Sequence, residues 1–331
     1  MRFIARRLGT YAVALWFAVS INFLIPRLIP GNAVQAMMAK YPNLTPQAEH
    51  SLDLLLGVGK NNGSLWHQYV VYLGNVSHGD LGVSLSQFPT KVTTLIGSAM
   101  PWTLTLVGTA TVLSFLIGTL LGVLAGWRRG GWFDRALPAL SFLQATPYFF
   151  LALLLIDGLS LHLDHGRIFP GYGTIDLGFH IGFNWPFIAN ALHHAVLPAL
   201  TLIVTSMAGW MLQMRNVMIT TIGEDYVLAA QAKGLSSRRV IFTYAARNAI
   251  LPNLAGFALA LGFVVAGALI MELVFSYQGL GYLLYQAVTS DDGPLMQGVF
   301  LVIAFAVLAA SLIADAVYAI ADPRARTRAA Y

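Results

Sequence analysis

Six stretches of about twenty mostly apolar residues constrain the fold of this 331-residue chain more than any other feature. A helix needs about 20 such residues to cross a hydrocarbon core of roughly 30 Å. Backbone groups in lipid must be satisfied within a helix or a closed barrel, and barrel strands alternate in hydrophobicity, so continuous apolar runs indicate helices. The stretches are 8–29, 102–126, 137–161, 195–214, 252–274 and 295–319. We therefore predict an all-α integral membrane protein with six transmembrane helices.

Basic residues are concentrated on one side of this predicted topology. Most of the 19 lysines and arginines lie before the first stretch, between the second and third, between the fourth and fifth, or after the last. The positive-inside rule assigns this side to the cytoplasm, so both termini are expected there. The net charge of +5 then follows from topology and needs no nucleic-acid partner. The residues on this side are Arg2, Arg6, Arg7, Arg128, Arg129, Arg135, Arg215, Lys233, Arg238, Arg239, Arg247, Arg324, Arg326 and Arg328.

These assignments divide the chain into four parts. Residues 1–29 form an N-terminal tail and a first transmembrane helix, because their apolar region is longer than the 7–15 residues of a signal-peptide core. Residues 30–100 form an extracytoplasmic segment, in which Trp66, Tyr69 and Tyr72 recur at helical spacing. That spacing predicts a short helix that either lies at the membrane interface or packs against the chain. The transmembrane core is 101–320, with a cytoplasmic loop at 215–251, and 321–331 is a cytoplasmic tail.

Several classes of activity are disfavoured by motifs that the sequence lacks. There is no cysteine, and therefore no disulfide, thiol nucleophile or cysteine metal site. There is no H-E-x-x-H signature and no P-loop, since Gly59-Lys60 is followed by Asn61. Any energy drawn from nucleotides must come from another chain. A metal contact at His162, Asp164 and His165 stays open, although imidazoles are common in solvated loops.

Three acidic residues fall inside the apolar stretches. A charged side chain at the centre of a bilayer costs about 2.5–3.5 kcal/mol on insertion scales, which makes each one a candidate for function. Asp157, Glu272 and Asp315 all lie near the ends of their stretches, where water or a partner lowers this cost. We therefore favour helix-end acids that face water or a packed partner over a role in transport.

Small residues recur every four positions in two of the stretches. In the stretch 102–126 this spacing predicts close approach of a second helix. In the stretch 252–274 the small residues either pack helices or line a cavity through which a solute passes. The residues are Gly118, Gly122 and Gly126 in the first case and Ala258, Gly262 and Ala266 in the second.

The loop 215–251 contains “YVLAAQAKGLSSRRVIF”, which has the pattern of a basic helical hairpin between two apolar stretches. Glu224 and Asp225 stand at the start of its first helix and Lys233 at its end, in keeping with the helix dipole. Gly234 then supplies the stop, as glycine does just beyond a helix. A solvated basic loop would not require acids at the start of a helix, a lysine at its end and a glycine stop.

The second half of the hairpin begins at a potential cap. Ser236 or Ser237 can cap a second helix, which is expected to run to Pro252. Ala229 and Ala230 give the first helix a small, flat surface that a groove in a partner protein could receive closely. The hairpin is therefore predicted to dock on another protein.

This hairpin resembles the EAA loop of ABC importer permeases, in which E-A-A-x-x-x-G forms a coupling helix that docks on the ATPase subunit. Leu228, Ala229, Ala230 and Gly234 occupy the motif, with Leu228 in place of its glutamate. The longer run “EDY…AKGLS…R…RNAILP” resembles the dipeptide, oligopeptide and nickel permease branch. So do “RFIARRLGTY”, “GDLGVSL”, “MELVFSYQGLGYLL” and “ADAVYAIADPR”, in the order of the B-type subunit. The outer motif of that branch usually carries Trp-Pro where this chain has “YQ” at 277–278.

The resemblance implies a type I ABC importer transmembrane domain that is not itself an enzyme. It would import di- or oligopeptides across the prokaryotic inner membrane, delivered by an extracytoplasmic solute-binding protein. Its partners would be a second homologous permease subunit, two ABC ATPase subunits and membrane lipid. ATP and Mg would be used by the ATPases, with no cofactor bound by this chain. Import of oligosaccharides or nickel by the same architecture, and a stand-alone secondary transporter or channel, are the alternatives.

Two sets of residues are expected to carry this function. Coupling to the ATPases is expected in the hairpin, and the translocation path in the fifth stretch and the outer connection after it. The coupling set is Glu224, Asp225, Leu228, Ala229, Ala230, Gly234, Arg238 and Arg239, and the path set is Gly262, Ala266, Glu272, Tyr277 and Gln278.

Overall fold

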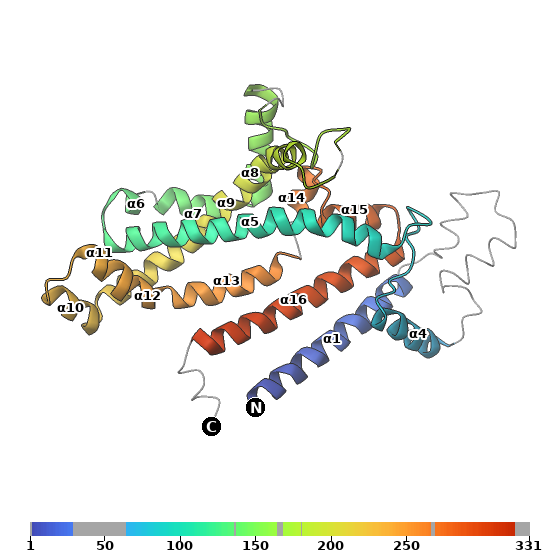
Figure 1. Cartoon of the computed structure of the whole chain (residues 1–331), viewed down its shortest axis with the longest axis horizontal. Coiled ribbons are helices and arrows are strands. Elements are labelled where there is room, and N and C mark those ends of the chain that lie inside the picture. Colours follow the sequence, from blue (N-terminus) through green and yellow to red (C-terminus); the bar gives the residue numbers. More distant parts are fainter. Residues whose placement is uncertain are drawn as a thin grey trace, which may run out of the picture.

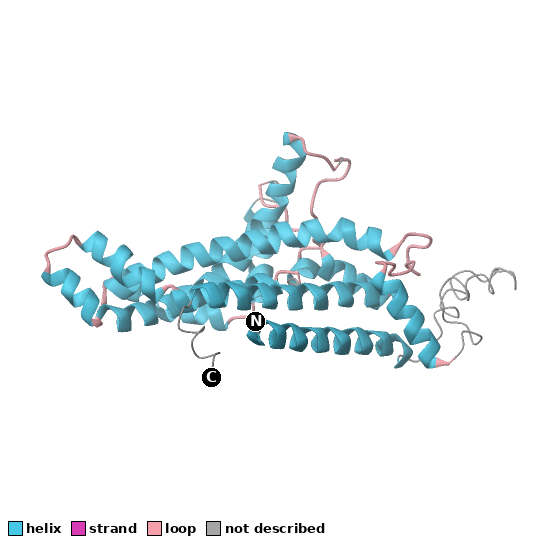
Figure 2. Ribbon diagram, turned by 60° about the horizontal axis from the view of Figure 1, so that its bottom comes forward, coloured by secondary structure: helices cyan, strands magenta, loops and turns pink. Residues whose placement is uncertain are grey.

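A computed structural model describes residues 2–28, 64–135, 137–163, 168–179, 181–265 and 269–321. Within these ranges the chain folds into helices joined by short connections, and strand pairing is limited to one isolated bridge between Val83 and Lys91. Most long helices lie lengthwise beside one another, as Figure 1 shows, and Figure 2 gives the same arrangement from a second direction. The prediction of an all-α chain is confirmed.

Three helices in the described residues are long and apolar enough to cross a membrane. They are α5 (Val92–Trp127), α9 (Trp185–Ile222) and the Gly293–Ile313 part of α16 (Gly293–Ala321). Two shorter apolar helices, Gly9–Leu24 within α1 (Arg2–Leu28) and α13 (Leu251–Phe263), lie in the first and fifth predicted stretches. Within the described residues, helix is therefore found in each apolar stretch of the sequence.

The third predicted stretch, 137–161, is not one straight helix. A short helix α6 (Trp132–Arg135) precedes α7 (Leu137–Ala145), and α8 (Tyr148–Leu155) runs on into the π-helical η1 (Ile156–Leu163). The direction changes by 102° between α7 and α8. Pro147 has no backbone N–H to donate and its ring disfavours helical geometry before it, so a new helix begins there. Figure 1 shows α8 and η1 standing out from the long helices, and the same projection is visible in Figure 2.

The fifth predicted stretch, 252–274, is also divided, which corrects the expectation of one continuous helix. α13 ends at Phe263 and α14 (Leu269–Val274) follows; α15 (Leu280–Thr289) comes after a tight connection. Val264 and Val265 follow α13 in a turn, and β-branched valines have lower helix propensity than alanine or leucine. Residues 266–268 lie outside the described residues.

The most extensive helix contact joins α5 and α9. A Cβ built on Gly118 or Gly122 would lie 2.5 or 2.6 Å from a backbone carbonyl oxygen of α9, and one on Gly126 would lie 2.5 Å from the Cβ of Met218. Real Cβ atoms do not approach so closely, so only glycine allows the two backbones to meet. The predicted close approach at these three glycines is confirmed.

The first helix is held against the last at both of its ends. The Tyr11 hydroxyl donates to Asp315 Oδ2 at 2.8 Å. Further along, the amides of Asn22 and Gln297 each donate to the other residue's backbone carbonyl, at 2.8 and 2.9 Å. α1 and α16 therefore run antiparallel, and Asp315 is a helix-end acid with a packed partner.

The short outer helix is present as α4 (Leu65–Ser77). The rings of Tyr69 and Tyr72 lie 5.1 and 5.5 Å from that of Phe23 on α1, while Trp66 is 71% exposed. Its two tyrosines therefore pack against the chain, and Trp66 faces outward.

Candidate functional site

The predicted hairpin forms one end of the helix bundle (Figure 1). It consists of α10 (Asp225–Ala232), α11 (Ser237–Arg239), the π-helical η2 (Val240–Ala245) and α12 (Ala246–Ala249), which continues into α13. π-helical turns inside α-helices are rare and are frequently found at functional sites. We call residues 224–250 the hairpin from here on.

Local chemistry explains where the first hairpin helix begins and ends. Glu224 is its N-cap residue and Asp225 lies in its first turn, where the helix dipole favours negative charge. Gly234 has φ +72°, a conformation that side-chain-bearing residues rarely adopt, and nothing lies within 4 Å of a Cβ placed on it. Ser236 is the N-cap residue of α11, as expected, but its hydroxyl makes no capping hydrogen bond.

The alanine pair divides between the inside and the outside of the hairpin. Ala229 is exposed, whereas Ala230 is 3% exposed and packs with Val227 in the hairpin's own core. This differs from the expectation that both alanines form the outer surface, and the reason is that adjacent residues of a helix point 100° apart. Leu228, which replaces the glutamate of the motif, is exposed beside Ala229.

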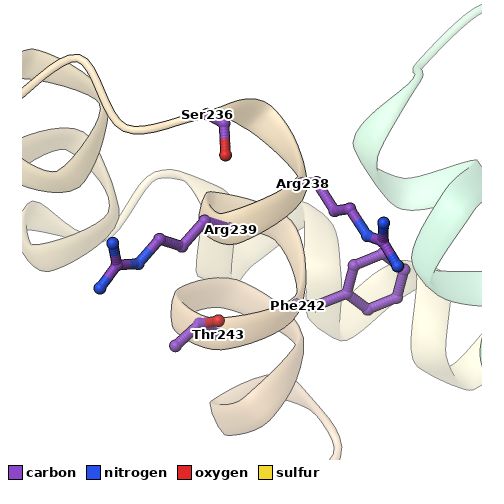
Figure 3. Close-up of a pocket in the computed structure, with 5 residues that line it drawn as sticks. All are labelled: Ser236, Arg238, Arg239, Phe242 and Thr243. Carbon is purple, nitrogen blue, oxygen red and sulfur yellow. The ribbon is translucent and has the colours of Figure 1, made fainter.

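The second half of the hairpin carries an open, cationic pocket of about 450 Å³. Its lining residues are Ser236, Arg238, Arg239, Phe242 and Thr243. Figure 3 shows the two guanidinium groups on opposite sides of the helix, with Arg238 beside the Phe242 ring and Arg239 above Thr243. Both arginines and the Phe242 ring are exposed. The geometry suits contact with an acidic, partly apolar surface of another protein.

One apolar cluster joins the hairpin to the long helices. It is built from Val227 and Ala230 of α10, Val240, Ile241, Ala245, Ala246 and Ala249 of the returning helix, Val123 of α5, and Met214 and Met218 of α9. Met214 and Met218 are fully buried. The hairpin and α9 therefore share one close-packed cluster.

A second, open pocket of about 480 Å³ lies along α9, between helices of the bundle. Its walls come from α5, α7, α9 and α13, and most of the side chains are polar although the surrounding helices are apolar. The lining residues are Thr111, Ser114, Gln144, Ser206, Gly209, Trp210, Leu212, Gln213 and Ala260. We call this the bundle pocket. Its volume is within the roughly 300–1,000 Å³ that small-molecule sites occupy.

The sequence prediction missed the residues of the bundle pocket. The available signal was a single uncharged polar residue inside an apolar stretch, as at Gln144 in “LSFLQATPYF” and Gln213 in “MLQMR”. Charged residues attract attention because insertion scales penalise them strongly. A glutamine is less costly, and a polar cluster of this kind becomes visible only when helices bring several polar groups together.

Four of the five residues expected in the translocation path lie in the described part of the chain, and three are buried. A Cβ on Gly262 would meet the Cβ of Ala310 at 2.8 Å, so this glycine packs α13 against α16. Glu272 and Tyr277 are 0% and 2% exposed, and Gln278 is exposed. Burial and then the nearby Glu272 carboxylate raise the pKa of Tyr277 above its usual value. Ala266 lies outside the described residues.

Glu272 is held by a set of donors that come from two other elements. Its Oε1 accepts from the Thr103 hydroxyl at 2.6 Å, and its Oε2 accepts from the backbone N–H groups of Gly281 and Tyr282 at 2.7 and 3.2 Å. The Thr103 hydroxyl oxygen in turn accepts from the Leu280 N–H at 2.8 Å. The carboxylate therefore caps the N-terminus of α15, where a negative charge is stabilised.

Asp157, Asp176 and the histidines near them make local contacts. Asp157 is exposed, with its carboxylate 3.4 Å from His162 Nδ1. Hydrogen bonds from Asn190 and then His194 hold the pKa of Asp176 below its usual value. Within the described ranges no group of three potential metal-ligating side chains is found, and Asp164 and His165 lie outside them.

Comparison with known proteins places the chain in a family. Residues 118–327 match the family described as binding-protein-dependent transport system inner membrane component. The chain is 33% identical to the di/tripeptide transport system permease protein of Pseudomonas aeruginosa (strain UCBPP-PA14), covering 98% of this chain and 99% of that protein. The dipeptide transport system permease protein of Escherichia coli (strain K12) gives the same values, and the oligopeptide transport system permease protein of Bacillus subtilis (strain 168) is 32% identical over 97% and 98%.

The chain belongs to the family of binding-protein-dependent transport system inner membrane components. It is a membrane permease of the ABC transporter class, as the hairpin resemblance implied, and the inner membrane is its location. The family's description, a binding-protein-dependent transport system, names a binding protein as a partner.

Proposed function

We propose that this chain is the permease subunit of an ATP-driven importer of di- or oligopeptides. The observation that carries the proposal is the hairpin, which presents Leu228, Ala229 and two arginines outward and is packed through Met214 and Met218 onto α9. The names of the three relatives, which are transport permeases for dipeptides, di/tripeptides and oligopeptides, support the substrate class.

The proposed assembly contains this chain, a second similar permease, two ABC ATPases and an extracytoplasmic solute-binding protein. ATP and Mg are used by the ATPases, and this chain binds no cofactor. Closure of the ATPases on ATP displaces the hairpin, and the displacement passes along α9 and opens the bundle toward the binding protein. Gly234 sets the hairpin angle, Ala229 makes the close contact, Ala230 supports it from inside, and the arginines form polar contacts.

The proposed topology has six membrane crossings with both termini and the hairpin in the cytoplasm. The broken third span and the two shorter apolar helices provide the crossings beyond the three long ones. The distribution of basic residues supports this orientation. The arm formed by α8 and η1 then lies toward the outer side, near the segment 168–179.

The bundle pocket bears on the alternative substrates. Its lining residues include no histidine, carboxylate or cysteine, the side chains that bind nickel. Oligosaccharides, whose polarity is similar to that of peptides, remain the alternative substrate class. A stand-alone secondary transporter or channel would give the exposed hairpin no role. Titration of the partner solute-binding protein with peptides, oligosaccharides and nickel separates the three substrate classes.

Gly234→Val tests the coupling role of the hairpin. Valine in the left-handed region costs roughly 1–2 kcal/mol, so the turn is expected to reorient and uptake to fall about tenfold or more, while ATP hydrolysis by the assembled complex continues. Gly130→Val is the matched control, because Gly130 also has a positive φ, +75°, but lies outside the hairpin. Uptake is measured in proteoliposomes with the complete importer. Normal uptake by Gly234→Val would overturn the coupling proposal.

A further inference from the structure

We propose that the bundle pocket is a passage subsite that binds backbone amide groups of the transported peptide. This inference rests on the proposed function and adds to it the chemical group that is recognised inside the membrane. The residues assigned to this role are Gln144 of α7 and Ser206 and Gln213 of α9, with Trp210 as an aromatic wall.

Hydrogen bonding sets these three polar side chains apart from their neighbours. Thr201 and Thr205 donate to carbonyls four residues earlier, at 2.8 Å in both cases. This is the ordinary way in which a hydroxyl is satisfied in an apolar helix. Within the described residues, Ser206, Gln144 and Gln213 have no hydrogen-bond partner and are exposed to the pocket.

Such groups need a partner at this position. Ser206 lies within the apolar stretch 195–214 and Gln213 at its end, and Gln144 lies in α7 beside α9. A hydroxyl or amide that is left unpaired in an apolar environment loses about 1–3 kcal/mol by mutational measures. Water, a polar solute or a polar group of another subunit would satisfy these side chains in the membrane.

The chemistry of the lining selects one class of solute. A glutamine amide has both N–H donors and a carbonyl acceptor, and a hydroxyl has both functions as well, so each can pair with either side of a peptide bond. No lining residue is charged, so the pocket contacts the group that all peptides share without discriminating among charged side chains. The Trp210 ring is held by edge contacts to Phe115 at 5.4 Å and to Phe257 at 6.5 Å, which gives the pocket a fixed wall.

The pocket is also connected to the hairpin. Buried Asn253 of α13 donates its amide to the Trp210 carbonyl and to the Thr119 hydroxyl, at 3.3 Å each. Met211 and Met214, which flank Gln213, are buried on the opposite face of α9. A displacement of α9 that starts at the hairpin therefore moves Trp210 and Gln213 against Gln144.

Thiol labelling tests whether the pocket is open and wet in the assembled importer. The chain has no cysteine, so Ser206→Cys introduces one reporter without further changes. In the complete complex this thiol is expected to react with a small water-soluble alkylating reagent, and transported tripeptide is expected to slow the reaction during turnover. Ala208→Cys, at a fully buried position two residues away, is the unreactive control. If Ser206→Cys reacts in the isolated chain but not in the complex, the second permease fills the pocket and the proposal is overturned.

Uptake measurements test the recognised group. Wild-type importer is compared with Gln144→Leu and Gln213→Leu for a labelled tripeptide and for its analogue with N-methylated backbone amides, both at saturating occupancy of the binding protein. We expect wild type to favour the unmodified peptide about tenfold and the variants to lose this preference, while binding-protein-stimulated ATP hydrolysis is retained. Gln286→Leu, at an exposed glutamine of α15 outside the pocket, should keep the wild-type ratio.

The results distinguish the two proposals. A wild-type importer that takes up no peptide would overturn the proposed function. Peptide uptake by wild type together with an unchanged preference in both variants would overturn only the subsite. If either leucine variant fails to assemble, the Ser206→Ala variant, which removes one hydroxyl and little volume, is measured in the same way, and an unchanged preference there counts against the subsite.

Discussion

Glu272 lies in the interior of an apolar chain, yet its carboxylate is fully used. It caps α15 through the N–H groups of Gly281 and Tyr282 and accepts from Thr103 of α5. This arrangement requires glycine in the motif “QGLG”, because a Cβ on Gly279 would lie 2.3 Å from Glu272 Oε1. One side chain therefore determines which residues the next connection can contain.

Replacing Gly279 by alanine is expected to displace this carboxylate and lower the stability of the fold. Overpacking of this kind typically costs about 1–3 kcal/mol. The thermal unfolding midpoint in detergent, followed by tryptophan fluorescence, provides the measurement. Gly97→Ala in α5 is the control, since nothing lies within 4 Å of the added Cβ and alanine favours helix. Equal midpoints for the two variants would contradict the capping role.

Asp292 is a second buried carboxylate with a similar task. Its Oδ2 accepts from the Ser86 N–H at 2.9 Å and from the hydroxyls of Ser84 and Ser86, and its Oδ1 accepts from the Leu295 N–H at 3.1 Å. Asp292 thus caps α16 and fixes the loop around 84–86 to that helix.

Asp292→Asn should destabilise the chain, because the asparagine amide presents donors where the protein already supplies donors. Leaving a buried group unsatisfied costs roughly 1–3 kcal/mol. Faster proteolysis of the loop around 84–86 and a lower unfolding midpoint are the expected results. Asp291→Asn is the matched control, as Asp291 is exposed and has φ +54°, which asparagine tolerates well. If both variants behaved in the same way, this role of Asp292 would be refuted.

At the scale of elements, α5 and α9 meet closely at Gly118, Gly122 and Gly126, and we call this contact the glycine seam. It supports both the hairpin and the bundle pocket. Gly122→Ala is expected to separate these helices, since the new Cβ would lie 2.6 Å from the Met211 carbonyl oxygen. We expect a loss of about 1–3 kcal/mol and reduced recovery of folded protein by size-exclusion chromatography. Gly108→Ala, on the same helix with its nearest neighbour at 3.8 Å, should behave like wild type. A normal elution profile for Gly122→Ala would argue against the seam.

Elements defined by local sequence could be predicted, and those defined by distant contacts could not. The glycine spacing of α5 and the stop at Gly234 depend on residues within a few positions, so both are readable from the chain. The 102° turn at Pro147 was also encoded locally, but the unbroken apolar composition of 137–161 concealed it. The hydrogen bonds of Glu272 were only partly readable, because the capped N–H groups lie 9 and 10 residues along the chain but Thr103 lies 169 residues away.

At the scale of the whole molecule, the proposed orientation predicts which positions are accessible from each side. Single cysteines at Leu177 and Ser237, both exposed, are placed on opposite sides of the membrane by the proposed topology. In intact spheroplasts an impermeant maleimide should label Leu177→Cys and leave Ser237→Cys unlabelled. Permeabilisation should make both reactive, which controls for local accessibility. Labelling of Ser237→Cys in intact spheroplasts would reverse the orientation.

The functional regions of the whole molecule were predicted to different extents. The hairpin could be located because the residues that start and stop its helices are local in sequence. Only the inward orientation of Ala230 could not be predicted without the structure. The bundle pocket could not, because Thr111, Gln144 and Gln213 come from three helices that meet only after packing. Of the expected path residues, Gly262 packs against Ala310 of α16 and Glu272 caps α15, and the role of this set in translocation stays a prediction.

The unpartnered glutamines and serine of the bundle pocket have a consequence for the life of the protein in the cell. A copy that was inserted without its companion subunit would leave these groups against lipid tails, an energetically poor state. Such orphan copies are suitable substrates for membrane quality-control proteases. The abundance of this chain is therefore expected to follow that of its companion, so that stoichiometry is enforced by degradation as well as by synthesis.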